Sequence, residues 1–271
     1  MKYNKKISLC VCSLILSLSL SGCANRVKAL EIPSNKMINT ESISKIQPMK
    51  NFKVETYASN YMNMCAFSYD ISQYTFTDGI KKDAHVIEYG KFRIVQPLHS
   101  QINKQKLLYN QVAAALEKLP TILSENIIEI QLLDYSNVLD KYWEKTYNMK
   151  NFMSYATGGS NKIYFYANSQ LNQNDKRVST ALIHESGHIL DDTISNDTER
   201  LSNSKEWSDI MESDFKDTNN FGLYCSTYSK SSTSNVEDFA EAVVGYCTDK
   251  DKFTKEYPNR SSKLEKLFNN K

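Results

Sequence analysis

Two histidines and a glutamate stand at a spacing that can bind a metal ion. His184, Glu185 and His188 form the pattern H-E-x-x-H. Four residues are about one turn of an α-helix, so both imidazoles would lie on one helix face. Two neutral imidazoles placed in this way can bind one zinc ion, and Glu185 beside them can accept a proton from a water that the metal activates. The pattern therefore indicates metal-dependent hydrolysis.

The flanking sequence decides whether this pattern is more than chance, because amphipathic helices also carry it by accident. Asn174 and Asp175 can cap the start of a helix, and no proline interrupts the run to Asp192. Gly187, between the histidines, would leave the cleft free of a side chain. Apolar residues recur at helical spacing on the side opposite the histidines, namely Val178, Leu182 and Ile189. We therefore expect a helix that buries one face and turns its histidines towards a cleft.

A hydrolytic zinc site needs a third protein ligand and an open position for water. Metzincin peptidases take that ligand from a third histidine, but here Ile194 stands six residues after His188 and Asp191 replaces the required glycine. Asp191 and Asp192 lie one turn beyond His188 and could reach a metal. We expect them instead to cap or orient the end of the helix.

A second acidic segment, residues 235–246, offers a better third ligand. Glu237 and Glu241 are four residues apart, so both would face the same side of a second helix. Phe239 and Val243 would pack on the opposite side. We assign Glu237 as the third ligand and Glu241 as the acceptor of the free N–H of a ligating histidine. A solvated acidic helix face is the alternative, because glutamates at this spacing are common.

The beginning of the chain predicts export and a membrane anchor. Residues 1–22 start with three lysines and continue with an apolar run from Ile7 to Leu20, which is typical of a signal peptide and short for a membrane span. The run ends L-S-G-C, which resembles the bacterial lipobox and makes Cys23 the candidate lipidation site. An ordinary secretory signal without lipid is the alternative. The polar residues 23–50 would form a flexible tether.

Charge and composition narrow the location and the partners. The formal net charge is +2, and three of the positive charges lie in the leader, so the mature chain would be close to neutral. This balance argues against nucleic acid as a partner. Frequent Lys, Asn and Ile suggest a Gram-positive bacterium. We expect a monomer on the extracytoplasmic face of the cell membrane, anchored through Cys23 or secreted, with protein or peptide substrates.

Residues 51–271 have the composition of one folded domain. The 271-residue chain is 41% hydrophobic and contains 17 Tyr and 11 Phe, which is enough for a substantial core. Alternating residues on either side of Gly90 predict a β-hairpin within 85–95. Apolar residues at helical spacing predict a helix over 104–119, which Pro120 ends. The sequence thus predicts an α+β fold.

Two apolar runs predict further strands, over 127–133 and 162–167. The second run directly precedes the histidine helix. It is either an internal strand of the sheet or an edge strand to which an extended peptide substrate adds.

Three of the six cysteines lie in the predicted domain: Cys65, Cys225 and Cys247. Cys225 and Cys247 flank the second acidic segment and could form a disulfide across it. The alternative is that all three are buried free thiols.

The two motifs together resemble a known family. H-E-S-G-H at 184–188 and E-D-F-A-E at 237–241 look like the anthrax-lethal-factor-like zinc metallopeptidases, which are related to the Pro-Pro endopeptidases. The resemblance is firm over 177–192 and 224–246 and loose over 104–170. It implies a gluzincin-type zinc peptidase domain with a small mixed sheet, an H-E-x-x-H helix and a second ligand-bearing helix, and one Zn²⁺ ion.

The same family places a tyrosine ahead of the second helix, where it stabilises the oxyanion. That tyrosine usually stands seven residues before the ligand glutamate, a position that Lys230 occupies in this chain. Tyr228 and Tyr224 stand nine and thirteen residues before Glu237. With a small insertion in this segment, the resemblance implies Tyr228 as the catalytic tyrosine and leaves Tyr224 as the alternative.

The sequence therefore predicts a membrane-anchored zinc endopeptidase in which Glu185 is the general base. One alternative is a non-catalytic surface lipoprotein, a binding or adhesion module with a vestigial zinc site. The complete H-E-x-x-H argues against it, because such a module needs no base. The other alternative is a zinc amidase that acts on cell-wall peptides, which the near-neutral mature charge and the lack of a wall-binding repeat do not favour.

Overall fold

The structure is a computed structural model that describes residues 53–56, 65–98, 102–135, 141, 145, 154–157, 160–166, 174–195, 199–218 and 222–269. These residues belong to one compact unit, Phe52–Lys271. The predicted signal peptide, the tether and Cys23 lie outside the described residues. Within the described ranges, no helix has the length and apolar character needed to cross a membrane.

The described strands form one mixed sheet in the order β1-β2-β3-β4-β5-β7-β6. They are β1 (Lys53–Thr56), β2 (Cys65–Thr75), β3 (Lys81–Tyr89), β4 (Phe92–Pro97), β5 (Glu129–Leu133), β6 (Ser154–Thr157) and β7 (Lys162–Tyr166). Strands β1 to β4 pair antiparallel, as do β6 and β7, whereas β5 pairs parallel with both β4 and β7. The predicted α+β class and the mixed sheet are confirmed.

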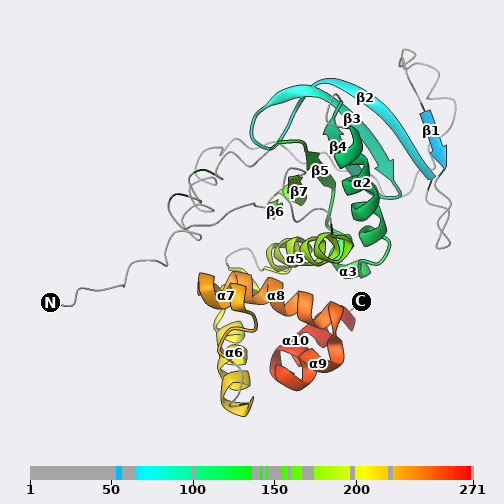
Figure 1. Cartoon of the computed structure of the whole chain (residues 1–271). Helices are drawn as coiled ribbons and strands as arrows, with labels where there is room; N and C mark the ends of the chain where they lie inside the picture. The colour runs from blue at the N-terminus through cyan, green and yellow to red at the C-terminus, as the bar shows by residue number, and fades with distance from the viewer. Residues whose placement is uncertain are drawn as a thin grey trace. The chain divides into compact units, whose positions relative to one another are not determined.

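The described helices are α2 (Ile102–Leu116), α3 (Thr121–Ser124), α5 (Asp175–Thr193), α6 (Lys205–Thr218), α7 (Thr227–Ser232), α8 (Asn235–Thr248), α9 (Lys250–Glu256) and α10 (Pro258–Asn269), with the short 3₁₀ segment η4 (Leu201–Asn203). Helix α5, which carries the histidine motif, contacts α2, α3 and α8, while α6, α9 and α10 lie beyond α8 (Figure 1). Figure 1 shows α5 between the sheet and α8, and it contacts α2, β6 and β7 as well. A helix that is covered on two sides has a fixed orientation. Such an orientation is required if its histidines are to bind a metal ion.

The predicted hairpin and the helix after it are present. Tyr89 pairs with Phe92 across the turn, where Gly90 has φ = 60°, a left-handed conformation that glycine adopts without steric cost. Helix α2 ends at Leu116, earlier than the sequence indicated. Pro120 disfavours helical conformation in the residue before it, so the chain leaves the helix over the preceding turn.

The interpretation of 162–167 as an edge strand is wrong. Strand β7 pairs with β5 on one side and with β6 on the other, so it is internal. Among the described strands, the last at this end of the sheet is β6, and Asn161, with φ = 54°, directly precedes β7. Four residues, S-Y-A-T, are too few to show a convincing alternating pattern, which explains why β6 is not recognisable from the sequence.

Helix α5 is buried by two separate apolar clusters. On one side Val178, Leu182 and Ile189 pack against the sheet and α2, as their spacing predicted. On the other side Ile183 and Leu190 pack against α8 and α6. Burial of apolar surface contributes roughly 25 cal/mol of folding free energy per Å². Both apolar clusters therefore help to hold α5 in place.

Candidate metal centre

The site begins with a well-capped helix. The Asn174 side chain accepts hydrogen bonds from the backbone N–H groups of Lys176 (3.0 Å) and Arg177 (3.3 Å), so the predicted cap is present. These bonds satisfy donors that have no partner within the helix. The helix then continues without a break to Thr193 and carries His184 and His188 on one face, one turn apart.

Gly187 has a different role from the expected one. A Cβ atom at this position would lie 3.2 Å from the Ala240 Cα and 3.5 Å from the Val243 Cβ, both on α8. The absence of a side chain therefore permits a close approach of two helices and does not serve to keep a cleft open. Because α8 comes this near, its glutamates can reach the histidines of α5.

Three ligand atoms from the two helices converge. The Nε2 atoms of His184 and His188 are 3.1 Å apart, and Glu237 Oε2 lies 3.2 Å from the first and 3.6 Å from the second. A metal ion with bonds of about 2.0–2.1 Å at tetrahedral angles separates its ligand atoms by about 3.3 Å. The predicted residues His184, His188 and Glu237 thus form a group that could hold a metal ion.

Glu241 lies behind the first histidine. Its Oε1 is 2.8 Å from His184 Nδ1, so that nitrogen carries a proton and donates to the carboxylate. In the neutral imidazole, the lone pair is then on Nε2 and faces Glu237 and His188. A carboxylate in this place both orients the ring and raises its basicity.

The electrostatics of the group favour a cation. Burial lowers the pKa of His184, but Glu237 and Glu241 outweigh it and raise this pKa to about 10. Burial likewise raises the pKa of Glu237, and its contacts with the two histidines reverse the effect and hold the pKa well below the usual range. Glu237 Oε2 is buried and has no hydrogen bond of normal geometry with a described residue. A metal ion could satisfy such a buried anionic oxygen beside two imidazole nitrogens.

The proposed base and the candidate tyrosine flank this group. Glu185 is 6% exposed and interacts electrostatically with His184. Tyr228, in the first turn of α7, is 42% exposed, and its ring centroid lies 5.9 Å from that of His184. Tyr224 packs instead in the apolar cluster around α8, where burial and the charge of Asp238 raise its pKa. Of the two tyrosines, Tyr228 is the one whose ring contacts a ligand histidine.

The aspartates that follow His188 hold the next segment of the chain. Asp191 is fully buried and accepts hydrogen bonds from the backbone N–H (3.0 Å) and the hydroxyl of Ser202. Burial raises its pKa. Asp192 forms an ion pair with Arg200. Both carboxylates thus tie the chain after α5 to the end of that helix, and neither belongs to the three-ligand group.

The disulfide alternative for Cys225 and Cys247 is wrong, because both are free thiols. The Cys225 thiol donates to the backbone oxygen of Asp238 at 3.4 Å, and burial raises the pKa of both thiols. The side chain of Cys65 lies outside the described residues.

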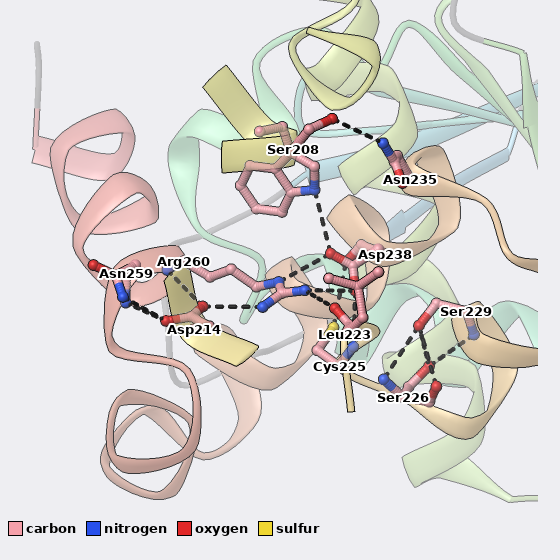
Figure 2. A network of polar contacts seen from close by, with 11 residues as sticks. Ser208, Asp214, Leu223, Cys225, Ser226, Ser229, Asn235, Asp238, Asn259 and Arg260 are labelled. Carbon is pink, nitrogen blue, oxygen red and sulfur yellow. Dashed lines mark hydrogen bonds and ion pairs between the residues drawn. The ribbon is translucent and has the colours of Figure 1, made fainter. Parts of the chain in front are cut away.

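A buried ion cluster between α8, α6 and α10 is not apparent from the sequence (Figure 2). Arg260, on α10, donates from Nη1 to Asp214 Oδ2 (3.0 Å) and from Nε to Asp238 Oδ2 (2.9 Å). All three side chains are at most 1% exposed. The one available signal is Asp238 itself, a charged residue on the apolar side of a helix, which implies a buried partner.

No protein-family model and no curated protein matches this chain. Inference about its function therefore depends on the site.

Proposed function

We propose that this protein is a zinc-dependent endopeptidase of the gluzincin type, similar to the anthrax-lethal-factor-like peptidases. One observation carries the proposal: two imidazole nitrogens and one carboxylate oxygen converge with separations of 3.1, 3.2 and 3.6 Å. Two histidines and a glutamate are a ligand set that catalytic zinc uses in peptidases, with the fourth position left for water.

The chemistry requires a base, an acid and a group that stabilises the oxyanion. When bound, zinc supplies a Lewis acid that lowers the pKa of a water molecule towards neutrality. Glu185 accepts a proton from that water during attack on the peptide carbonyl and passes it to the leaving amine. Tyr228 donates a hydrogen bond to the carbonyl oxygen as its negative charge develops. Glu241 holds the tautomer of His184 that presents Nε2 to the metal.

The edge strand offers a way to bind an extended peptide. In the described part of the sheet, β6 is the last strand beyond β7, and it contacts α5. A peptide that adds to an exposed edge gains main-chain hydrogen bonds along its length. We therefore propose β6, and not β7, as the strand that aligns the substrate with the metal centre.

The amino-terminal features extend the proposal to the location of the enzyme. A lipid on Cys23 would anchor the mature chain to the extracytoplasmic face of the cell membrane, with residues 24–50 as the tether. Replacement of Cys23 by Ser should release the protein from the membrane fraction, and retention there would contradict the lipid anchor.

The decisive experiment separates metal binding from catalysis. The native chain, Glu185→Gln and the control Glu212→Gln on the exposed face of α6 should each bind one zinc ion, measured by mass spectrometry of the metal. On a peptide library that includes cell-wall stem peptides, the native chain and the control should cleave, and Glu185→Gln and the chelator-treated enzyme should not. Near-native turnover by Glu185→Gln would refute its role as the base. A zinc-loaded native protein without turnover favours a binding lipoprotein, and cleavage of stem peptides alone favours an amidase.

A further inference from the structure

The Arg260 cluster fixes the first turn of α8, where the third ligand stands. Asp238 follows Glu237 directly in that turn and is fully buried. Arg260 donates to both oxygens of Asp238, at 2.9 Å from Nε and 3.3 Å from Nη2. Trp207 Nε1 donates to Oδ2 at 3.2 Å. Successive residues of a helix point about 100° apart, so fixing Asp238 towards α10 fixes Glu237 towards α5.

The same cluster holds the segment that leads into α7. Arg260 Nη2 donates to the backbone oxygen of Leu223, and Asp238 Oδ1 accepts from the backbone N–H of Cys225 at 2.8 Å (Figure 2). Ser226 follows immediately and caps α7, since its hydroxyl accepts from the Ser229 N–H at 3.0 Å. Tyr228 lies in the first turn of the helix capped in this way. One guanidinium thus contacts both the turn that presents Glu237 and the segment that presents Tyr228.

The far end of the cluster ties this arrangement to α6. Asp214 Oδ2 accepts from Arg260 Nη1 and from the Arg260 backbone N–H at 3.1 Å. Asp214 Oδ1 accepts from the Asn259 N–H at 2.7 Å. Both aspartates that the guanidinium contacts accept further hydrogen bonds from other groups, which restricts the orientation of Arg260.

We infer that Arg260 is a positioning residue for the metal centre: through Asp238 and the backbone of Leu223 it holds Glu237 and Tyr228 in place together. The inference rests on the proposed function, since it assigns to Arg260 an effect on zinc binding. A planar fork that reaches two carboxylates and a carbonyl can hold this geometry, whereas the single ammonium of lysine cannot.

The test compares variants of the full chain that differ in what they disturb. Arg260→Lys keeps the positive charge and loses the fork, and Asp238→Asn keeps the shape of the side chain and loses its charge. Leu264→Val and Leu264→Ala remove packing from a fully buried position on the same helix without removing a bond of the cluster. For each variant, zinc affinity is measured by competition with a coloured chelator, the visible spectrum is recorded with cobalt(II), and the free energy of unfolding is measured in urea without metal.

Arg260→Lys should weaken zinc binding about tenfold and alter the cobalt spectrum, because a shift of the outer partners of a ligand typically costs this much. Asp238→Asn should also weaken zinc binding, and it provides the test if Arg260→Lys does not fold. The Leu264 variant of matching stability should bind both metals as the native chain does. Native affinity in both cluster variants, or equal loss in the Leu264 variant, would overturn the inference. Failure of the native chain to bind zinc, or binding that Glu237→Gln does not weaken, would refute the proposed function itself.

Discussion

Helix α8 carries two groups of buried charge, one turned towards α10 and one towards α5, and their partners differ. Towards α10, Asp238 meets a guanidinium, an indole N–H and a backbone N–H, so its charge is balanced by the protein. Towards α5, Glu237 and Glu241 meet only the histidine rings of α5 as ion-pair partners among the described residues. The first group is made of side chains that pair with one another, and the second has the geometry of a ligand set that could hold a metal ion.

The two groups therefore differ in how much each contributes to stability and to metal binding. A buried ion pair is costly to break because each partner is then left unpaired in a medium of low polarity. Carboxylates gathered around two imidazoles form a ligand group that a bound cation can stabilise further. We therefore expect changes near Asp238 to lower the stability of the metal-free protein as well as its zinc affinity, and changes near Glu237 to act chiefly on metal binding.

The largest effect should follow from removal of the guanidinium. Arg260→Met leaves Asp214 and Asp238 buried without their partner and should destabilise the metal-free protein by about 3–5 kcal/mol. Urea titration in the presence of chelator measures the free energy of unfolding of the metal-free protein. Lys263 lies on the same helix as Arg260 and forms a surface ion pair with Glu206 of α6. Lys263→Met should therefore lower the free energy of unfolding by at most about 1 kcal/mol. Equal losses in the two variants would show that the buried cluster is not special.

The second effect concerns zinc binding by Glu237, on the side of α8 that is turned towards α5. With free zinc at about 100 times its dissociation constant, the native protein should gain about 2.7 kcal/mol over the chelator-treated form. Glu237→Gln should lose most of this gain because a neutral amide is a poor zinc ligand. Thermal unfolding with and without chelator measures the gain for each protein. A variant that still gains as much as the native chain would remove Glu237 from the ligand set.

The third effect tests the close approach of α5 and α8. Gly187→Ala places a methyl group against the Ala240 backbone and should destabilise by about 1–3 kcal/mol while weakening zinc binding. Gly245→Ala is the matched control, since its added Cβ would meet the Phe253 ring on α9, away from the ligands. The control should lose stability without losing affinity for zinc. Equal zinc affinities in the two variants would argue against the role of Gly187.

The smallest effect should come from the cap of α5, which belongs to neither group. Asn174→Ala should cost about 1 kcal/mol of stability, and Asn174→Ser should restore most of it. Zinc affinity should stay within twofold of the native value in both, because the ligands lie nearly three turns further along the helix. A clear loss of affinity would mean that general destabilisation is sufficient to impair the site.

The elements that carry the ligands were predictable because their signals are local. Asn174 is a cap, the apolar residues of α5 recur every three or four positions, and Glu237 and Glu241 share a helix face, all of which can be read within a short segment. The α+β class was predictable because strand-like and helix-like segments both occur in the domain, whereas the mixed sheet was implied only by the family resemblance. Strand β6 was missed because a four-residue strand has no pattern of its own and owes its conformation to pairing with β7.

The parts that could not be predicted depend on contacts between distant residues. Arg260 meets Asp214 and Asp238 across 46 and 22 positions, and no local pattern in α10 marks one arginine as buried. The role of Gly187 depends on how closely two helices approach, which the sequence does not encode locally. The resemblance already named Tyr228 with Tyr224 as the alternative, and the structure adds that the ring of Tyr228 lies against His184.

The place of Arg260 in α10 sets a lower bound on any minimal fragment of this protein. Every candidate ligand, the base and the tyrosine occur before Thr248, so a shortened version that stops after α8 would look complete from its motifs. Such a fragment would nonetheless lack the guanidinium that pairs with both Asp214 and Asp238. Expression designs and shuffled hybrids should therefore retain the chain through α10.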